Sequence, residues 1–262
     1  MKKIFALFET SFFIFPIHFI SVIQRQEKSV VRCYSKILDT SFLGIRGIFG
    51  RGLLMICIVC STYLQTNAQK TLTEATIVYN MAVEDATDAS VANMLNNATL
   101  TLYIKGLMAR TDFKSSAVSQ SVIFNGKDNT ATILKEMGSN KFLINLTKAN
   151  WNDFNQKYDD IKFVIGSGTK TILGYECKEA VATLKDQSTF TVYFTTALTM
   201  PNKEYNRQFA GLLGVPLEYG ATIKDWKVKY TATKLNFNLV PADKFELPTS
   251  GYRVLQYGKE AL

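Results

Sequence analysis

Residues 226–239, with the sequence WKVKYTATKLNFNL, decide how the fold is read. Apolar side chains fall on even-numbered positions as far as Ala232 and on odd-numbered positions from Leu235 onward. Alternation with a period of two is typical of a β-strand with one buried face. One additional residue at 233–234 changes the phase as a β-bulge does, and bulges bend sheets. We therefore predict a long, strongly curved sheet; the alternative is that the strand ends at this point.

Four other segments alternate in the same way, at residues 76–83, 100–105, 141–146 and 189–194. Each has one apolar face and one mixed face, which indicates an antiparallel sheet with one side exposed to water. Glycine, asparagine and aspartate separate the segments, as residues that form turns do. The regular spacing predicts roughly nine to eleven strands, arranged as a meander.

Three segments have helical rather than strand periodicity, at residues 86–96, 149–158 and 201–213. Each places its apolar side chains on one face, and such a stripe has to be buried against another element. The last segment begins with Pro201 and stops at Gly214, which suits the first turn and the end of a helix. The predicted fold is mainly β: a strongly curved antiparallel sheet that forms an incomplete (half) barrel around two or three short helices.

The N-terminal part contains a signal for export. Residues 53–64, LLMICIVCSTYL, are mostly apolar, follow basic residues and precede Ala68. A basic flank, a short apolar core and a small final residue describe a secretory signal peptide, and twelve residues are too few to span a bilayer. We expect cleavage after Ala68. The alternative is a lipoprotein signal in which Cys57 or Cys60 carries the lipid.

This reading divides the chain into an N-terminal extension (1–50), a signal peptide (51–68) and a single domain (69–262). The extension contains another apolar run at residues 4–23. That run is either a membrane segment or the product of a mis-assigned start, with translation beginning nearer Arg46. We favour the second interpretation, because a cleaved signal does not normally lie so deep inside a chain.

Charge and cysteine content narrow the classes of partner. Residues 1–69 hold eight Lys or Arg and three Asp or Glu, whereas residues 70–262 hold 22 and 19. Most of the excess positive charge therefore lies in the leader, and we expect no nucleic-acid partner. Cys177 is the only cysteine after residue 68, so the domain forms no internal disulfide. Export without disulfides favours a bacterial periplasm. We expect a monomer located in the periplasm or at the outer envelope.

The residues that usually carry chemistry are scarce. His18 is the only histidine, so residues 69–262 supply no Ser-His-Asp triad and lack the commonest zinc ligand. The adjacent carboxylates at 84–85 and 159–160 are interpreted as solvated turn residues; a pair of carboxylates assembled by the fold, as in glycosidases, stays open. The lysines at 224, 227 and 229 are interpreted as the exposed face of a strand. We predict no catalytic residues, no metal site, no cofactor and no enzyme activity.

Three stretches carry a resemblance to a known family. Residues 172–180, ILGYECKEA, resemble the IxGYxCKxA signature of uncharacterised exported Bacteroidota proteins in the LolA-like superfamily of outer-membrane lipoprotein carriers. Residues 209–218, FAGLLGVPLE, are similar to the GLPGLxLE-type (GLPGLI) turn of that group, with the proline displaced. Residues 243–252, DKFELPTSGY, resemble its FxLPxGY ending. The resemblance covers about residues 74–254.

The resemblance implies an incomplete antiparallel barrel wrapped around short helices. It also implies an apolar concavity, in which the carrier members of the superfamily bind lipid or lipoprotein acyl chains. No catalytic residue is carried over. The displaced Pro216 departs from the family pattern.

Together these observations predict an exported protein that binds or carries a lipid or other apolar ligand in the concave face of the half barrel. The expected lining residues are Trp151, Phe154, Phe209, Leu212 and Leu213. Such a pocket needs no charged anchor, because burial stabilises an acyl chain by ~0.8 kcal/mol per methylene. The alternative is a structural or protein-interaction module of the cell envelope, in which the same residues seal a dry core and the partner is an envelope protein.

Overall fold

The computed structural model describes residues 69–84, 98–223 and 226–258. The chain divides into two compact units, Met1–Thr66 and Asn67–Leu262, and the described residues belong to the second. The predicted N-terminal extension, signal peptide and helix at 86–96 lie outside the described residues. Within the described part of the chain, no helix combines the length and the hydropathy needed to cross a membrane.

Strands make up most of the described chain. In order they are β1 (Lys70–Thr71), β2 (Glu74–Val83), β3 (Thr99–Lys105), β4 (Met108–Lys114), β5 (Val118–Asn125), β6 (Thr130–Met137), β7 (Asn140–Leu146), β8 (Lys162–Ile172), β9 (Tyr175–Thr183), β10 (Thr189–Thr195), β11 (Leu198–Thr199), β12 (Val215–Ile223), β13 (Trp226–Asn236) and β14 (Arg253–Leu255). The helical elements are α4 (Lys148–Phe154) and the 3-10 helices η1 (Gln156–Tyr158), η2 (Glu204–Phe209) and η3 (Ala242–Phe245).

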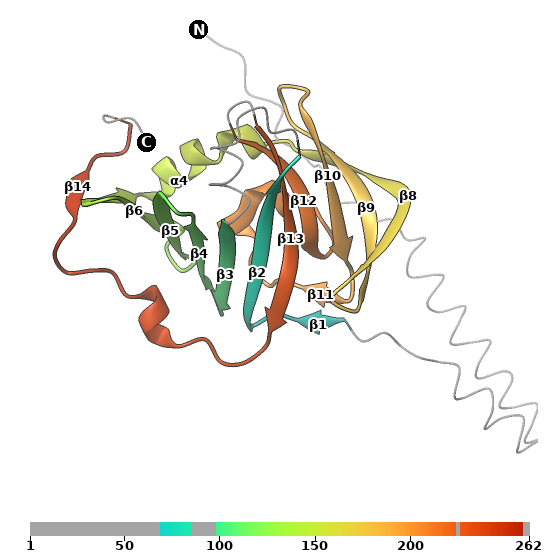
Figure 1. Cartoon of the computed structure of the whole chain (residues 1–262), viewed down its shortest axis with the longest axis horizontal. Helices are drawn as coiled ribbons and strands as arrows, with labels where there is room; N and C mark the ends of the chain where they lie inside the picture. Colours follow the sequence, from blue (N-terminus) through green and yellow to red (C-terminus); the bar gives the residue numbers. More distant parts are fainter. Residues whose placement is uncertain (1–68, 85–97, 224–225, 259–262) are drawn as a thin grey trace, which may run out of the picture. The chain divides into compact units, whose positions relative to one another are not determined.

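Twelve strands form one sheet in the order β14-β7-β6-β5-β4-β3-β2-β13-β12-β10-β9-β8 (Figure 1). Strands β2 to β7 form one antiparallel meander, and β8, β9, β10, β12 and β13 form a second. Pairing of β13 with β2 joins the two meanders. The sheet stays open, with β14 and β8 at its edges. The predicted mainly β class and the large curved antiparallel sheet are confirmed.

The structure has more strands than the expected nine to eleven, because three short strands show no alternation in the sequence. Strands β1 and β11 have two residues each and form a separate parallel pair. Strand β14 has three residues and pairs with β7 in parallel. Segments this short show no period, so alternation cannot reveal them.

The phase change near residue 233 is the predicted bulge. Val228, Tyr230 and Ala232 lie opposite odd-numbered residues of β2, and after a register shift Leu235 lies opposite Ile77. Thr233 is the additional residue between the two registers. The bulge keeps both halves of β13 facing the same core, so the strand continues rather than ending.

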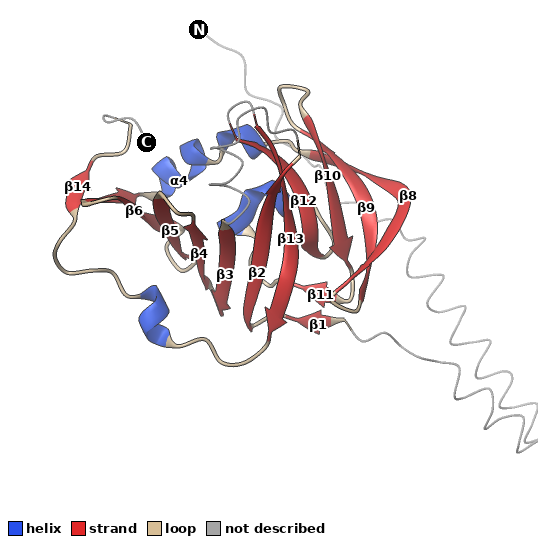
Figure 2. Ribbon diagram, viewed as in Figure 1, coloured by secondary structure: helices blue, strands red, loops and turns tan. Residues whose placement is uncertain are grey.

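The pairing register defines two faces of the sheet. The inner face carries Ile77, Ile133 and Tyr219, and the outer face carries Ile123 and Glu218, because neighbouring residues of a strand point to opposite sides. Helix α4 and η2 pack on the inner face, which they partly cover (Figure 2).

Over β5, β6 and β7 the outer face is covered as well. Val240 and Phe245 from the segment after β13 pack on a row of three buried side chains, Ile123, Leu134 and Leu143. Both faces of this half of the sheet are therefore buried.

The two predicted helices within the described residues have different outcomes. The segment at 149–158 is helical, but it is divided at Asn155 into α4 and η1. The segment expected to be helical at 201–213 contains only the six-residue 3-10 helix η2, with a non-helical backbone at Asn206. The prediction of a longer helix is wrong, because the chain here follows the apolar surface of the sheet instead of completing regular helical turns.

Candidate functional site

The first group of predicted lining residues lies beside α4. Thr147 caps this helix by accepting a hydrogen bond from the backbone N–H of Asn150 at 3.2 Å. Trp151 is buried, with its ring 5.2 Å from Phe124 of β5 and 5.8 Å from the stacked ring of Phe154. The indole packs on the inner face and keeps α4 against the sheet.

The second group lies in the largest apolar cluster, over the central strands. Phe209 makes edge-on contacts with Tyr219 at 4.8 Å and with Phe190 at 6.2 Å between ring centroids. Tyr219 stacks in turn on Tyr230 at 4.7 Å. Leu212 is buried in the same cluster. The inner face at this point is an aromatic surface that is already filled by side chains.

The five predicted residues do not belong to one cluster. Trp151 and Phe154 belong to one cluster, Phe209 and Leu212 to another, and Leu213 is 79% exposed. Tyr205, in η2, packs against both clusters and so connects them. The sequence period placed these residues on apolar faces, but it did not reveal which of them meet.

A small cavity adjoins the larger apolar cluster. It measures about 20 Å³, and the residues around it are Tyr79, Leu102, Met200, Lys203, Tyr205, Asn206, Phe209, Gly214 and Pro216. This volume is near the minimum for a single water molecule. This cavity is too small for an acyl chain, so an apolar ligand at this place requires part of the chain to move.

Residues 200–214 pack on the central strands of the inner face and are here called the cover segment. Its only helical element is the short helix η2. Several of its hydrogen bonds are made by side chains rather than by the backbone alone. Lys203 Nζ donates to the carbonyl oxygens of Leu212 and, at 3.3 Å, of Ala210. Burial lowers the pKa of Lys203. Trp151 Nε1 donates to the carbonyl oxygen of Glu204 at 3.1 Å.

Gly214 ends the cover segment where two backbones come together. A Cβ atom at this position would lie 2.1 Å from the carbonyl oxygen of Thr195 in β10. Only glycine permits this approach. The predicted helix stop is therefore a site of close packing against β10.

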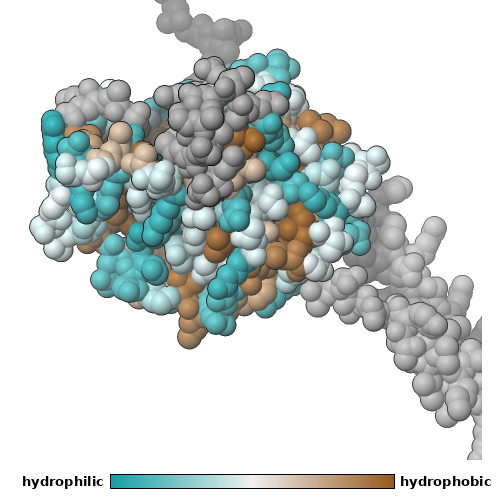
Figure 3. Space-filling model, in the orientation of Figure 1, coloured by the Kyte–Doolittle hydropathy of each residue, from teal (hydrophilic) through white to brown (hydrophobic). Residues whose placement is uncertain are grey.

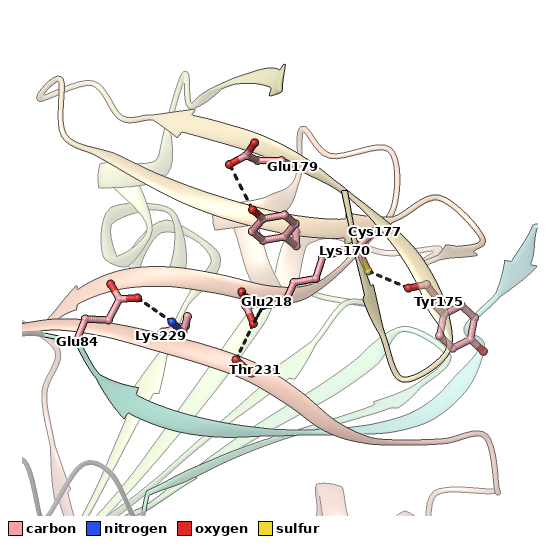
Figure 4. Close-up of polar contacts among 9 residues, drawn as sticks. Glu84, Lys170, Tyr175, Cys177, Glu179, Glu218, Lys229 and Thr231 are labelled. Carbon is pink, nitrogen blue, oxygen red and sulfur yellow. Dashed lines mark hydrogen bonds and ion pairs between the residues drawn. The ribbon is translucent and has the colours of Figure 1, made fainter. Parts of the chain in front are cut away.

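A second candidate site lies on the outer face, around the buried carboxylate of Glu218. Lys170 Nζ donates to both carboxylate oxygens at 2.8 Å, and Thr231 Oγ1 donates to Oε2 at 3.0 Å (Figure 4). The Glu218 side chain is only 8% exposed. A carboxylate this buried requires such partners, because removal of an unpaired charge from water is costly.

Other polar residues extend this network across neighbouring strands. Lys170 Nζ lies 5.5 Å from the ring centroid of Tyr193, whose hydroxyl donates to Glu179 at 3.5 Å. Further along the sheet, Lys229 Nζ and Glu84 form an ion pair at 3.0 Å (Figure 4). The hydrogen bond that Lys229 donates to Glu84 raises the pKa of Lys229.

Four of these residues, Glu84, Tyr193, Glu218 and Lys229, border a groove of about 390 Å³ over β10, β12 and β13. Its lining comprises Glu84, Thr189, Phe190, Thr191, Tyr193, Glu218, Tyr219, Gly220, Ala221, Thr222, Lys227, Val228 and Lys229. Lys227 and Lys229, interpreted from sequence as an exposed strand face, are part of this border. Lys224 lies outside the described residues.

One feature of the sequence points to this site, although the alternation of apolar residues does not explain it. Glu218 is a charged residue within the buried run of β12, between Leu217 and Tyr219. A charge at such a position implies a partner elsewhere in the fold. Its partner Lys170 lies 48 residues away, in β8, and the pattern gives no means of identifying it.

The structure contains little that suits a metal ion. Among residues 69–84, 98–223 and 226–258, no three His, Cys, Asp or Glu side chains gather closely enough to hold one. Cys177 is buried, and burial raises the pKa of its thiol to about 11. The thiol is the main form at neutral pH, which does not suit a nucleophile.

Comparisons with known proteins give distant likenesses. No family model and no curated protein sequence matches the chain. The chain is similar to PNGF-II, at 16% identity and a TM-score of 0.40, over 70% of this chain and 30% of that one. It is also similar to an uncharacterized conserved protein from Thermus thermophilus (6% identity, TM-score 0.43, 77% of this chain and 99% of that one). A third likeness is to MucB (12% identity, TM-score 0.36, 73% and 64%). The chain thus spans less than a third of PNGF-II, and no family membership follows.

Proposed function

We propose that this protein is an exported binding or carrier protein for a lipid or other apolar ligand, which it holds between the inner face and the cover segment. The observation that supports this proposal most is the irregular structure of the cover segment. An aromatic and apolar surface lies beneath a segment whose only helical element is η2, six residues long. Segments with few regular hydrogen bonds open at lower cost than strands or long helices.

The energetics suit an acyl chain. Opening the cover segment exposes Phe209 and Leu212, and each buried side chain of this size is worth about 1.5–3 kcal/mol. A ligand that fills the same space recovers that free energy, because each buried methylene contributes ~0.8 kcal/mol. A fatty-acyl chain thus compensates for the displaced side chains without a charged anchor.

Lys203 is the residue by which the proposal is tested. Its ammonium group binds the carbonyl oxygens of Ala210 and Leu212, so it ties one end of the cover segment to the other. Lys203→Met keeps the length and apolar stem of the side chain and removes the donor. The variant is expected to open more often and therefore to bind an apolar probe more tightly, because apparent affinity rises with the population of the binding-competent state.

The experiment uses protein purified gently from cells that export it. Native mass spectrometry with lipid extraction detects a co-purified lipid, and a dansyl-labelled fatty acid reports binding by fluorescence. Lys203→Met is compared with Leu213→Gln, a change at a side chain that is already exposed. We expect a lipid at one per chain, or tighter probe binding by Lys203→Met with Leu213→Gln unchanged. A bare protein, with no probe binding by either variant, rejects the carrier function.

The second candidate is a protein-interaction module of the envelope, and one observation favours it. Strand β8 is an edge of the sheet and exposes Val164 and Ile165, at 67% and 55%. An open edge accepts a strand from another protein. Figure 3 shows one side of the molecule, on which hydrophobic and hydrophilic surface alternate. A photo-crosslinking amino acid at 164 should then capture one defined envelope protein, whereas one at Lys135 should not.

A further inference from the structure

The groove on the outer face is distinct from the interior proposed to hold an apolar ligand. Glu218, Gly220 and Thr222 of β12 point to the side opposite Tyr219, which packs against Phe209. The same alternation directs Thr191 away from the core. The two sites therefore lie on different faces of the sheet and have different chemistry.

Gly220 is the floor of this groove. A Cβ atom here would meet nothing nearer than 3.8 Å, the distance to Cβ of Phe190, so packing does not require glycine. Glycine weakens a strand interior, and where it occurs it often marks a place where a ligand approaches the backbone. The missing side chain leaves open the space that a residue with a larger side chain would occupy.

The groove combines donors and acceptors. Three exposed threonines, Thr189, Thr191 and Thr222, bring hydroxyl groups that both donate and accept. Glu218 accepts two hydrogen bonds at Oε2 and one at Oε1, which leaves Oε1 with capacity for one more. Lys227 adds an exposed donor.

Charge at the groove is close to balanced. The lining contains two carboxylates, of Glu84 and Glu218, and two ammonium groups, of Lys227 and Lys229. Behind the lining, Lys170 pairs with Glu218. The two signs balance, so the groove offers no excess charge to attract a phosphate or a cation. A neutral ligand rich in hydroxyl groups suits both the charge and the alternation of donors with acceptors, because each hydroxyl of the ligand also donates and accepts.

From these observations we propose that the groove over Gly220 binds a neutral carbohydrate. Its volume of about 390 Å³ is within the range of small-ligand sites and suits a short stretch of sugar units. Thr191 and Thr222 bind sugar hydroxyls from either side of Gly220. Glu218 accepts a hydrogen bond from one sugar hydroxyl while Lys170 holds its charge in place.

The test is saturation-transfer NMR on the protein in the form that cells accumulate, with maltotriose, mannotriose and chitotriose as probes. Gly220→Tyr fills the groove with a ring, and Gly220→Ala is the matched control, since its methyl group makes only ordinary contacts. Thr191→Val removes one hydroxyl without a change of shape and guards against misfolding of the tyrosine variant. Thermal unfolding monitored by circular dichroism verifies that each variant is folded.

We expect at least one trisaccharide to give a transfer signal. Gly220→Tyr should abolish it and Gly220→Ala should keep it. Thr191→Val should weaken binding by about threefold to tenfold, as loss of one hydrogen bond does. A signal that persists in folded Gly220→Tyr and is unchanged in Thr191→Val overturns the site. No signal from any of the three probes at millimolar concentration overturns the carbohydrate assignment. Neither result bears on the fatty-acid measurement, which concerns the inner face.

Discussion

The indole N–H of Trp151 binds the carbonyl oxygen of Glu204 at 3.1 Å and so ties α4 to the cover segment. Trp151→Phe removes this donor and part of a buried ring. We expect the free energy of unfolding to fall by about 1–3 kcal/mol, measured by urea denaturation. Trp226→Phe makes the same chemical change on a half-buried side chain of β13 and serves as the control. Equal losses in the two variants would show that the bond to Glu204 contributes nothing.

Two glycines of the β12 region should respond to alanine by very different amounts. Gly214→Ala forces a Cβ atom to 2.1 Å from the backbone oxygen of Thr195, which cannot move without disturbing β10. We expect a loss of more than about 2 kcal/mol of stability. Gly220→Ala meets only ordinary contacts at 3.8 Å or more, and should change stability by less than about 1 kcal/mol. Urea denaturation of both variants measures the contrast, and similar losses would contradict it.

The segment after β13 should be sensitive to acid through Glu74. Its carboxylate accepts a hydrogen bond from the N–H of Val240 at 2.8 Å, while Lys105 donates to the carbonyl oxygen of Val240 at 2.7 Å. The hydrogen bond from Val240, followed by Lys105, holds the pKa of Glu74 below its ordinary value of 4.5. A lowered pKa means that the ionised form stabilises the fold, so this contribution is complete above pH 4.5 and disappears as the pH falls through the lowered pKa.

Glu74→Gln should therefore be less stable than the original protein at pH 7, and the difference should shrink as the pH falls below 4.5. Urea denaturation between pH 7 and pH 3 measures it. Glu246→Gln, at an exposed position of the same segment, controls for the substitution itself. If the difference in the free energy of unfolding stays constant over this pH range, Glu74 is not a source of the acid sensitivity.

Cys177 should resist alkylation in the folded protein. Burial raises the pKa of its thiol to about 11, and its Sγ lies 3.6 Å from the carbonyl oxygen of Tyr175. At pH 8 only about one thiol in a thousand is then the reactive thiolate. Peptide mapping after iodoacetamide treatment should find Cys177 unmodified in native protein and modified in urea. Rapid labelling of native protein would indicate that the β8–β9 hairpin opens.

Much of the fold was predictable because it depends on local alternation. The strands at 76–83, 100–105, 141–146 and 189–194 are strands in the structure, and the bulge at Thr233 follows from one change of phase. Element lengths were less predictable. The cover segment has a helical apolar spacing, yet it forms only η2, because contact with the sheet outweighs helix propensity over so short a span.

The candidate sites were likewise predictable only in part. The pattern of residues alone predicts a mainly β protein with a curved sheet, and residues 69–262 contain no histidine. It also placed Trp151 and Phe209 on apolar faces. The three-dimensional fold was needed to learn that Leu212 is buried while Leu213 is exposed, and that Lys170 pairs with Glu218 across the outer face. The reason is physical: a period of two assigns a side chain to a face, whereas its partner on that face depends on strand order, register and twist, which contacts distant in sequence establish together.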